Sequence, residues 1–220
     1  MPRTESAADR AYGAIHQLIM SREFEIGEPI SEYRVSERLE LSRTPVREAL
    51  KRLEQRGLLE SFPGRGMFVR RYTIKDVIEI TEVMREVECV AIRKMIANPV
   101  QKDIDRLHEI VTEQASAFER GDLDKALSDG RAFHNLISAR VDNSRLHAAV
   151  ADAGEQSDYL SRLEVQTSQG NEITAAAVDE HRQLVELLAK GDGEGAEVLL
   201  REHLSTHEGE LLLLASAGVL

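Results

Sequence analysis

The chain has 220 residues, 42% of them hydrophobic, which is enough for two domains that each bury a core. Its 28 Lys and Arg against 39 Asp and Glu give a net charge of −11, which argues against indiscriminate binding of nucleic acid along the whole chain. The single cysteine, Cys89, excludes an intrachain disulfide, and no apolar stretch has the length of a signal peptide or a membrane span, so a cytoplasmic location is expected.

The first 72 residues predict three helices and then a hairpin. Apolar residues recur at helical spacing over residues 9–22 and 33–41, which predicts two amphipathic helices. A third helix is predicted to begin at about Thr44, because Ser42 or Thr44 can serve as its N-cap and a proline follows in the first turn. Gly57 can end this helix in a left-handed conformation. The second and third helices then form a helix-turn-helix pair.

A basic surface is expected on the third helix. Its buried stripe is predicted from the three- and four-residue spacing of Val46, Ala49, Leu50 and Leu53. This stripe leaves four basic side chains largely on other faces: Arg43, Arg47, Lys51 and Arg52. After the helix, two short strands are predicted around a tight turn with Arg65 and Gly66 at its tip. A helix-turn-helix followed by such a hairpin is a winged helix-turn-helix, whose second helix enters the major groove of DNA.

The distribution of charge agrees with this assignment. Residues 1–72 hold 13 Lys and Arg against 11 Asp and Glu, whereas residues 73–220 hold 15 against 28. Within residues 41–72 the counts are 8 and 3. A local basic surface on an acidic protein favours sequence-selective DNA contacts, because the acidic remainder repels other phosphates. The alternative, a merely solvated helix face, does not account for the hairpin that follows.

Four runs in this region closely resemble the N-terminal domain of GntR-family bacterial transcription regulators: ISEYRVSERL from residue 30, SRTPVREAL from residue 42, RLEQRGL from residue 52, and GRG at 64–66. The resemblance implies that the main operator contacts come from Arg43, Thr44 and Arg47, and that Arg65 with Gly66 enters the minor groove. Ser42 and Arg34 are further DNA-binding candidates. Tyr33 stands where family members often have an arginine, and Arg34 is the neighbour that could substitute for it.

From Thr73 onward the periodicity is almost wholly helical. Thr73 can cap a helix over residues 74–97, and five more helices are predicted over about 99–120, 122–141, 143–166, 172–191 and 195–215. Six antiparallel helices with short breaks form a bundle, which can hold a ligand between facing helices. The expected fold is therefore mainly α, with a winged helix-turn-helix DNA-binding domain at 1–72. An all-helical domain at 73–220 would serve effector binding and dimerisation.

Three histidines in the acidic half are candidate metal ligands. His134 lies in RAFHNLI, His181 in DEHRQLV and His203 in REHLSTH, each beside apolar residues that turn inward. Imidazoles from three helices that converge inside a bundle suit zinc or nickel. Taken singly, each is more often an ordinary core or boundary histidine.

The pairs F133-H134 and E180-H181 and the run E202-H203-L204 resemble the FCD effector domain of the FadR-like branch of the GntR family. The length and the six helices look closer to the VanR-type subgroup. The resemblance implies that these histidines hold a divalent metal together with an aspartate four residues before the first of them. Gly130 occupies that position. Asp129 would point about 140° away from the face of His134 unless the helix is distorted, and His207 is a weaker replacement. A three-histidine site completed by water or effector is expected.

The resemblance also implies a small carboxylate effector. Arg85 matches the family position that commonly fixes the effector carboxylate, and Arg162 is a second candidate. The alternative for Arg85 is an ion pair with Glu82 or Glu88, at helical spacings of three residues.

These features predict a ligand-responsive repressor that binds a pseudo-palindromic operator as a homodimer and is not an enzyme. Two other functions remain open. One is a metal-dependent hydrolase or lyase, which needs a general base beside the metal; Glu180 and Glu202 are adjacent to candidate ligands but point about 100° away from them. The other is a DNA-binding dimer whose sensor pocket is vestigial, as the absence of the aspartate suggests.

Overall fold

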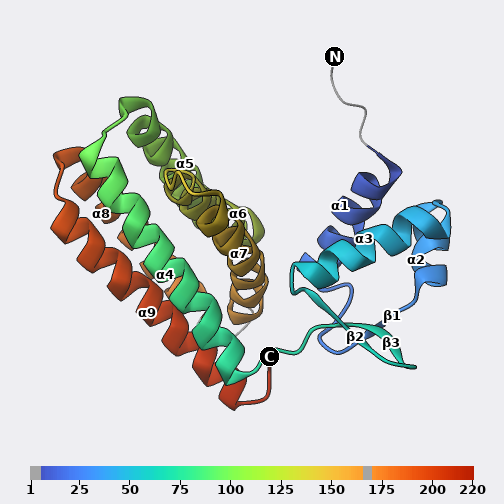
Figure 1. The fold of residues 1–220 in the computed structure, drawn as a ribbon. Coiled ribbons are helices and arrows are strands. Elements are labelled where there is room, and N and C mark those ends of the chain that lie inside the picture. The colour runs from blue at the N-terminus through green and yellow to red at the C-terminus, as the bar shows by residue number, and fades with distance from the viewer. Residues whose placement is uncertain (1–5, 166–169) are drawn as a thin grey trace. The chain divides into compact units, whose positions relative to one another are not determined.

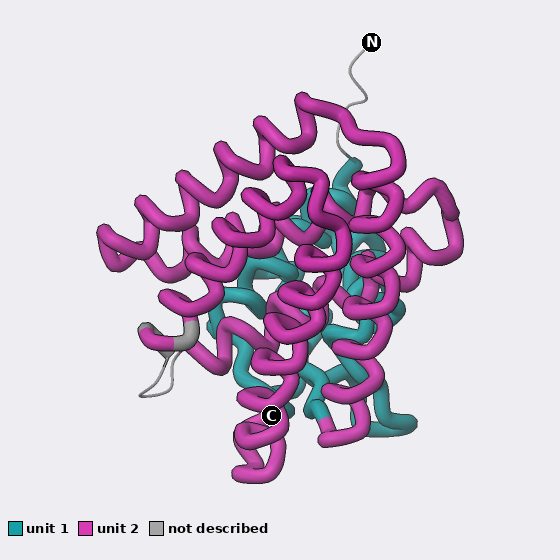
Figure 2. The backbone as a smooth tube through the Cα atoms, turned by 90° about the vertical axis from the view of Figure 1, so that its left-hand side faces the viewer, with its two compact units in different colours: residues 1–72 teal, residues 73–220 magenta. Residues whose placement is uncertain are grey.

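The computed structural model describes residues 6–165 and 170–220. It divides into two compact units, Met1–Tyr72 and Thr73–Leu220, drawn in different colours in Figure 2. The division falls at Thr73, whose hydroxyl accepts a hydrogen bond from the Asp76 N–H while the Asp76 carboxylate accepts from the Thr73 N–H. This capping box starts the first helix of the second unit.

From residue 6 onward, the first unit contains three helices and a small sheet (Figure 1): α1 (Ala7–Met20), β1 (Pro29–Ile30), α2 (Glu32–Leu39), α3 (Arg43–Gln55), β2 (Leu59–Phe62) and β3 (Gly66–Val69). Helix α3 begins one residue earlier than predicted, with Ser42 as its N-cap. Its predicted apolar stripe is buried and packs against α1. Gly57 follows the helix with φ of 76°, in the left-handed region expected for it. Recognition helix and hairpin therefore form as the sequence predicts.

The sheet differs from the prediction by one strand. The two predicted strands pair antiparallel as β2 and β3, and β1 adds to the other side of β3, with Ile30 opposite Met67. A two-residue strand is too short to show an alternating pattern, so only its pairing with a distant segment identifies it. Gly66, with φ of 96°, begins β3 at the tip of the hairpin.

Over its described residues, the second unit consists of the six predicted helices: α4 (Ile74–Ala97), α5 (Gln101–Glu119), α6 (Leu123–Ser138), α7 (Ser144–Glu164), α8 (Gly170–Lys190) and α9 (Gly193–Ser216). The side chains of Asp122, Asn143 and Asp192 cap the N-termini of α6, α7 and α9. Helix α4 runs alongside α9, and α5 alongside α6 (Figure 1). The core of the unit includes Phe133 and Tyr159, both fully buried.

Among the described helices, none is both long and apolar enough to cross a membrane.

Candidate functional site

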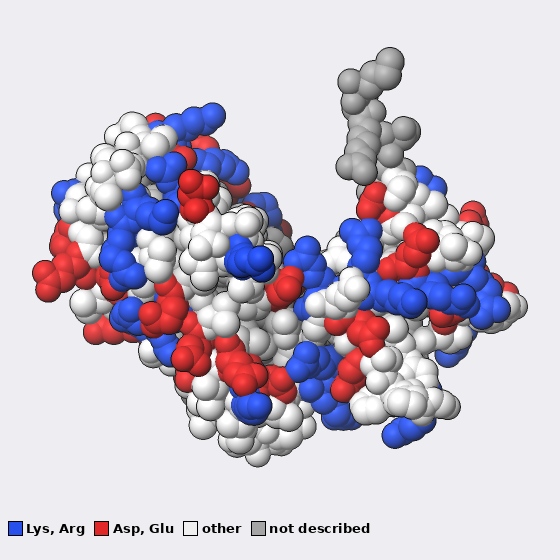
Figure 3. Space-filling view, in the orientation of Figure 1, with Lys and Arg blue, Asp and Glu red and all other residues white. Residues whose placement is uncertain are grey.

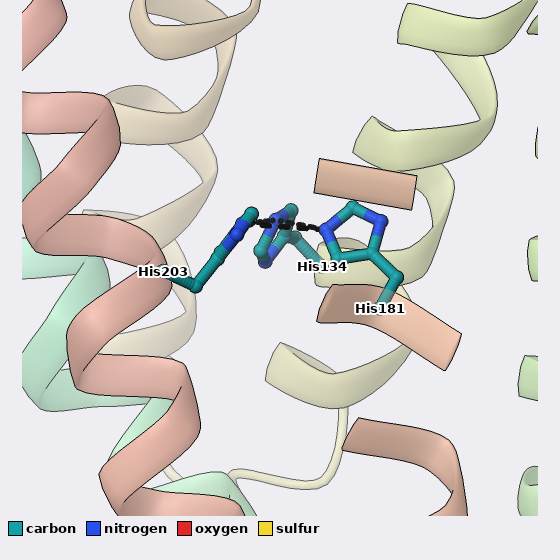
Figure 4. Close-up of side chains that lie close together, drawn as sticks. All are labelled: His134, His181 and His203. Carbon is teal, nitrogen blue, oxygen red and sulfur yellow. Dashed lines mark hydrogen bonds between the residues drawn. The ribbon is translucent and has the colours of Figure 1, made fainter. Parts of the chain in front are cut away.

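The three predicted histidines meet inside the second unit. His134 comes from α6, His181 from α8 and His203 from α9, and their rings point toward one another in Figure 4. Each pair of Nε2 atoms is 3.3 Å apart. His181 and His203 are buried, and the His134 side chain is 11% exposed. The Phe133 ring stacks on His181 at a centroid distance of 4.3 Å, which restricts the orientation of that imidazole.

The other ring nitrogen of each histidine has its own oxygen partner. His134 Nδ1 lies 2.7 Å from a Glu88 oxygen, and His203 Nδ1 lies 2.6 Å from a Glu180 oxygen. His181 Nδ1 donates to Oε1 of Gln114 at 2.8 Å. Such outer partners orient metal-binding imidazoles and keep the proton on Nδ1.

With protons on Nδ1, the three Nε2 atoms are buried acceptors that face one another and have no donor among them. Three nitrogens bound to one tetrahedral zinc at about 2.0–2.1 Å lie about 3.3–3.4 Å apart, which agrees with the observed spacing of 3.3 Å. Burial lowers the pKa of His134 and His181 well below the ordinary value of 6.5, so both imidazoles are neutral near pH 7. The donor set therefore fits a divalent metal ion.

Burial has the opposite effect on Glu88. It raises the pKa of this carboxyl from 4.5 to about 8, although the positive charge of Arg131 favours the ionised form. The pair formed by Glu88 and His134 therefore holds a proton near neutral pH in the metal-free protein.

Gly130 occupies the position where the resemblance implies an aspartate, and the space beside it is taken by a side chain from another helix. A Cβ placed on Gly130 would lie 2.8 Å from Nε2 of Gln114, the residue whose oxygen holds His181. The carboxylate of Asp129 forms an ion pair with Lys125, one turn earlier on α6. Asp129 is not part of the histidine cluster, as its angular offset along an undistorted helix requires. His207, the other replacement candidate, also lies outside the cluster, with its Nδ1 3.2 Å from Oε2 of Glu164.

A cavity of about 330 Å³ adjoins the histidines, which is within the range of small-molecule sites. Arg131 lines it and lies three residues before His134 on α6. Burial lowers the pKa of this guanidinium, and its charge interacts with Glu88, Asp158 and Glu155. No ion pair within 4 Å forms between Arg131 and any of these three described carboxylates. A side chain at Gly154 of α7 would overlap the guanidinium, so the glycine makes room for it.

The two arginines proposed from the sequence do not line this cavity. Arg85 forms an ion pair with Glu208 of α9 at 3.1 Å. The predicted alternative partners, Glu82 and Glu88, were wrong, because helix packing places a residue of another helix closer. Arg162 donates to Asp124 at 2.8 Å and to Ser128 at 3.1 Å.

Sequence reasoning missed Gln114, Arg131 and the roles of Glu88 and Glu180. The sequence did contain a signal for two of them, Gln114 and Arg131. Gln114 falls in the buried stripe of α5, where a polar residue needs a buried partner. Arg131 is spaced three residues from His134 and so shares its helix face.

The second candidate site is the exposed surface of α3 and the wing. Four predicted DNA contacts are exposed at the start of α3: Ser42, Arg43, Thr44 and Arg47. Glu32 of α2 accepts two hydrogen bonds from Arg47, at 2.9 and 2.8 Å, and one from Arg43 at 3.4 Å. Hydrogen bonds and charge from Arg47 lower the pKa of Glu32. Figure 3 shows basic and acidic side chains interspersed on the visible face of this unit.

At the wing, Arg65 is exposed and its guanidinium lies 5.7 Å from the centre of the Phe62 ring and 5.6 Å from that of Phe68. These contacts with the two aromatic faces orient the arginine at the hairpin tip. Arg34 is exposed on α2, and the neighbouring Tyr33 hydroxyl donates to Glu37.

Comparisons with known proteins agree with this organisation. Among curated relatives, the HTH-type transcriptional repressor RspR of Escherichia coli is 26% identical over 81% of this chain and 77% of its own length. A probable D-xylose utilization operon transcriptional repressor of Paenarthrobacter nicotinovorans is 28% identical over 83% of this chain and 78% of its own. The crystal structure of a putative GntR transcriptional regulator from Rhodococcus sp. RHA1 has the same fold, with a TM-score of 0.81 and 22% identity over 93% of this chain and 97% of that one.

Two family models match the two units separately. The model of the gntR family of bacterial regulatory proteins matches residues 7–69, and the model of the FCD domain matches residues 79–206, more than half of the chain. The VanR-type subgroup stays a prediction. The chain belongs to the GntR family of bacterial regulatory proteins and carries an FCD domain in its helical unit.

Proposed function

We propose that this protein is a cytoplasmic transcription repressor that binds a pseudo-palindromic operator as a homodimer and responds to a small carboxylate. One observation carries the proposal: a cavity beside three converging histidines lies in the helical unit, and the same chain presents exposed arginines on a recognition helix. The names of the two curated relatives support repression as the direction of regulation.

In the DNA-bound state, α3 would enter the major groove. Arg43, Thr44 and Arg47 would contact base edges, because N-terminal residues of a recognition helix reach them. Ser42 and Arg34 would contact phosphates, which fix the position of the helix without selecting sequence. Arg65 and Gly66 would enter the minor groove, where glycine permits close approach of the backbone. A single short helix has modest affinity, so two copies on paired half-sites are expected.

In the helical unit, His134, His181 and His203 would hold a divalent metal, zinc or nickel. A metal bound there would act as a Lewis acid for a carboxylate oxygen of the effector. Glu88, Gln114 and Glu180 would orient the three imidazoles through their Nδ1 atoms.

Arg131 is better placed than Arg85 or Arg162 to bind the effector carboxylate. It lines the cavity, and its partly buried charge has no ion pair within 4 Å to the carboxylates it interacts with. A guanidinium can bind a carboxylate through two parallel hydrogen bonds. Arg85 and Arg162 instead hold carboxylates of the protein and would stabilise the packing of the helices.

Regulation requires that the effector bind the DNA-competent and DNA-incompetent dimers with different affinity. The vestigial-pocket alternative has one observation in its favour, the glycine at position 130. Three observations speak against it: the cavity, the converging Nε2 atoms, and Arg131 in the cavity wall without an ion pair within 4 Å to the carboxylates it interacts with. The hydrolase or lyase alternative needs a base beside the metal, whereas Glu180 is engaged with His203 and Glu202 is exposed.

The proposal is tested by measuring the metal content of the purified protein and its mobility shift on DNA from upstream of its own gene. Zinc, nickel and a panel of small carboxylic acids are added in turn. We expect a specific shift that one acid abolishes. A specific shift that no acid changes, with protein that binds no metal, would favour the vestigial-pocket alternative.

Arg47→Ala tests the DNA half of the proposal independently. If Arg47 contacts a guanine edge, its loss should cost about 1–3 kcal/mol of binding free energy at that base pair. The variant should therefore bind the operator more weakly and discriminate less at one position of each half-site. Arg93→Ala, in the helical unit, is the control. Unchanged affinity and specificity of Arg47→Ala would contradict the docking of α3.

A further inference from the structure

The cavity contains a second polar group, separate from the histidine cluster. Glu164 of α7 lies with Oε2 3.2 Å from Nδ1 of His207 on α9. Nε2 of His207 lies 3.4 Å from the Ser157 hydroxyl and 3.3 Å from the Ser161 hydroxyl, both on α7. All four side chains line the cavity. We name them the Glu164 subsite.

Glu164 is buried, and one of its carboxylate oxygens accepts no hydrogen bond from the described residues. The residue is 3% exposed, and its Oε1 has no hydrogen-bond partner among the described residues. Leaving a buried acceptor unpaired is costly, and a carboxylate oxygen can only accept. The group that satisfies it in the functional complex must therefore be a hydrogen-bond donor.

The serines present acceptors as well. The Ser161 hydroxyl donates to the Ser157 carbonyl at 2.9 Å. If His207 donates from Nδ1 to Glu164, its Nε2 accepts, and the Ser157 hydroxyl donates to it. Both hydroxyl protons are then engaged within the protein, and the oxygen lone pairs are left for the ligand. The Glu164 subsite thus selects a group rich in donors.

The charge of the cavity wall favours a cation there. Five carboxylate side chains are among the described residues that line the cavity: Asp158, Glu164, Glu172, Glu180 and Glu210. Arg131 is the only Lys or Arg among those described lining residues. An ammonium group combines a positive charge with three donors, whereas a hydroxyl supplies one donor and no charge.

We propose that the effector is an amino-substituted carboxylate, with its ammonium group bound by the Glu164 subsite. This inference rests on the proposed function, in which Arg131 and the histidine cluster bind the carboxylate end. The ammonium would donate to Glu164 Oε1 and to a serine oxygen. A plain dicarboxylate would place a second negative charge against Glu164 and is disfavoured.

The test is calorimetric titration of the full-length, zinc-loaded protein with matched ligands. For the four- and six-carbon straight-chain acids, the parent acid is compared with its hydroxy- and amino-substituted forms at each carbon. We expect at least one amino acid to bind about tenfold or more tightly than its parent, because a charge-assisted hydrogen bond at a buried site contributes at least that factor. The matching hydroxy acid should gain less than half as much binding free energy over the parent acid as the amino acid does.

Glu164→Gln should reduce the amino-to-parent affinity ratio to near one and leave parent binding within about twofold. Glu172→Gln, which removes an exposed carboxylate from the same cavity wall, is the matched control and should keep the ratio. Ser157→Ala gives a second readout if Glu164→Gln fails to fold, and should lower the ratio partially.

The outcomes separate the inference from the function on which it rests. If no acid binds, with or without an amine, the carboxylate-sensing function is overturned. If parent acids bind and no amine improves binding, only the amine subsite is overturned. Hydroxy acids that bind as tightly as the matching amino acids would overturn the assignment of an ammonium group. A Glu164→Gln variant that keeps the wild-type ratio of amino-acid to parent-acid affinity would also overturn it.

Discussion

The Glu32 carboxylate holds the two arginines that we propose as base contacts. It accepts two hydrogen bonds from Arg47 and one from Arg43. An anion at this position both fixes the direction of the guanidinium groups and competes with phosphates for them. If Arg43 and Arg47 contact bases as proposed, sequence specificity would depend on Glu32, a residue that need not touch a base itself.

Glu32→Gln should separate these two effects. An exposed ion pair is worth up to about 1 kcal/mol, so affinity for unrelated DNA should rise about two- to fivefold. The ratio of operator to unrelated affinity should fall, because Arg47 loses its fixed orientation. Fluorescence anisotropy at several salt concentrations measures both. Glu37→Gln, which removes the same charge from α2, is the control, and an equal rise in both variants would attribute the effect to net charge alone.

The proton on the pair of Glu88 and His134 predicts a dependence on pH. Because burial raises the pKa of Glu88 from 4.5 to about 8, the folded metal-free protein keeps a proton that the unfolded chain loses above pH 4.5. The Glu88 contribution to the free energy of unfolding should therefore fall as pH rises from 4.5 to 8. The lowered pKa values of His134 and His181 act in the opposite sense below their ordinary value of 6.5, so the net fall is expected between pH 6.5 and 8. Metal binding favours proton release, so zinc affinity should rise with pH over the upper part of this range.

Glu88→Gln should flatten both dependences, since an amide does not titrate. Thermal unfolding without metal and zinc titrations between pH 6.5 and 8.5 provide the measurement. The control variant is Glu86→Gln, which removes an exposed carboxyl two residues away on α4. Parallel slopes in wild type and Glu88→Gln would show that another group carries the proton.

At the scale of helices, two interior glycines make room for side chains of neighbouring elements. Gly130 of α6 leaves space for Gln114 of α5, and Gly154 of α7 leaves space for Arg131 of α6. An interior glycine costs a helix roughly 0.5–1 kcal/mol relative to alanine. In return, Gln114 reaches His181, and Arg131 reaches the cavity.

The pairing of Gly130 with Gln114 predicts how a fourth ligand can be introduced. Gly130→Asp alone should improve zinc affinity little, because its Cβ meets Nε2 of Gln114. Combined with Gln114→Ala, it should bind zinc about tenfold or more tightly, since an added charged ligand offsets the loss of the outer partner of His181. Competition with a chromophoric chelator measures this. A double variant no tighter than wild type would mean that position 130 does not face the metal.

At the scale of the whole molecule, the two compact units carry different candidate ligand sites. DNA is expected to stabilise the first unit, and metal the second, because a ligand stabilises the state it binds. Coupling between the sites would appear only as a change in one unit on binding at the other.

Hydrogen exchange resolved along the full-length chain should show this division. Zinc should slow exchange in α6, α8 and α9. At a free zinc concentration one hundred times the dissociation constant, the added protection should be about 2.7 kcal/mol. Operator DNA should instead slow exchange in α3 and the wing. His181→Ala should abolish the zinc effect. His108→Ala, an exposed histidine on α5, should preserve it. Zinc protection that persists without His181 would place the metal elsewhere.

Local sequence was sufficient to predict the order of the helices and most of their bounds. Caps such as Thr73 and Asn143, the left-handed Gly57, and the spacing of apolar residues act within one or two turns, so they operate before any packing. The three histidines could also be singled out, because each stands on an inward helix face. Their relative distance could not be derived from spacing.

Packing alone decided which partner each polar residue takes. Arg85 meets Glu208, Arg162 meets Asp124, and Gln114 meets His181, across 38 to 123 positions of the chain. Such contacts depend on how helices lie against one another, and a difference of a few ångströms exchanges one carboxylate for another. For the same reason, the pairing of β1 with β3 and the unsatisfied oxygen of Glu164 are visible only in the tertiary structure. The spacing of Arg131 from His134 could be read from the sequence, but its place in the cavity wall could not.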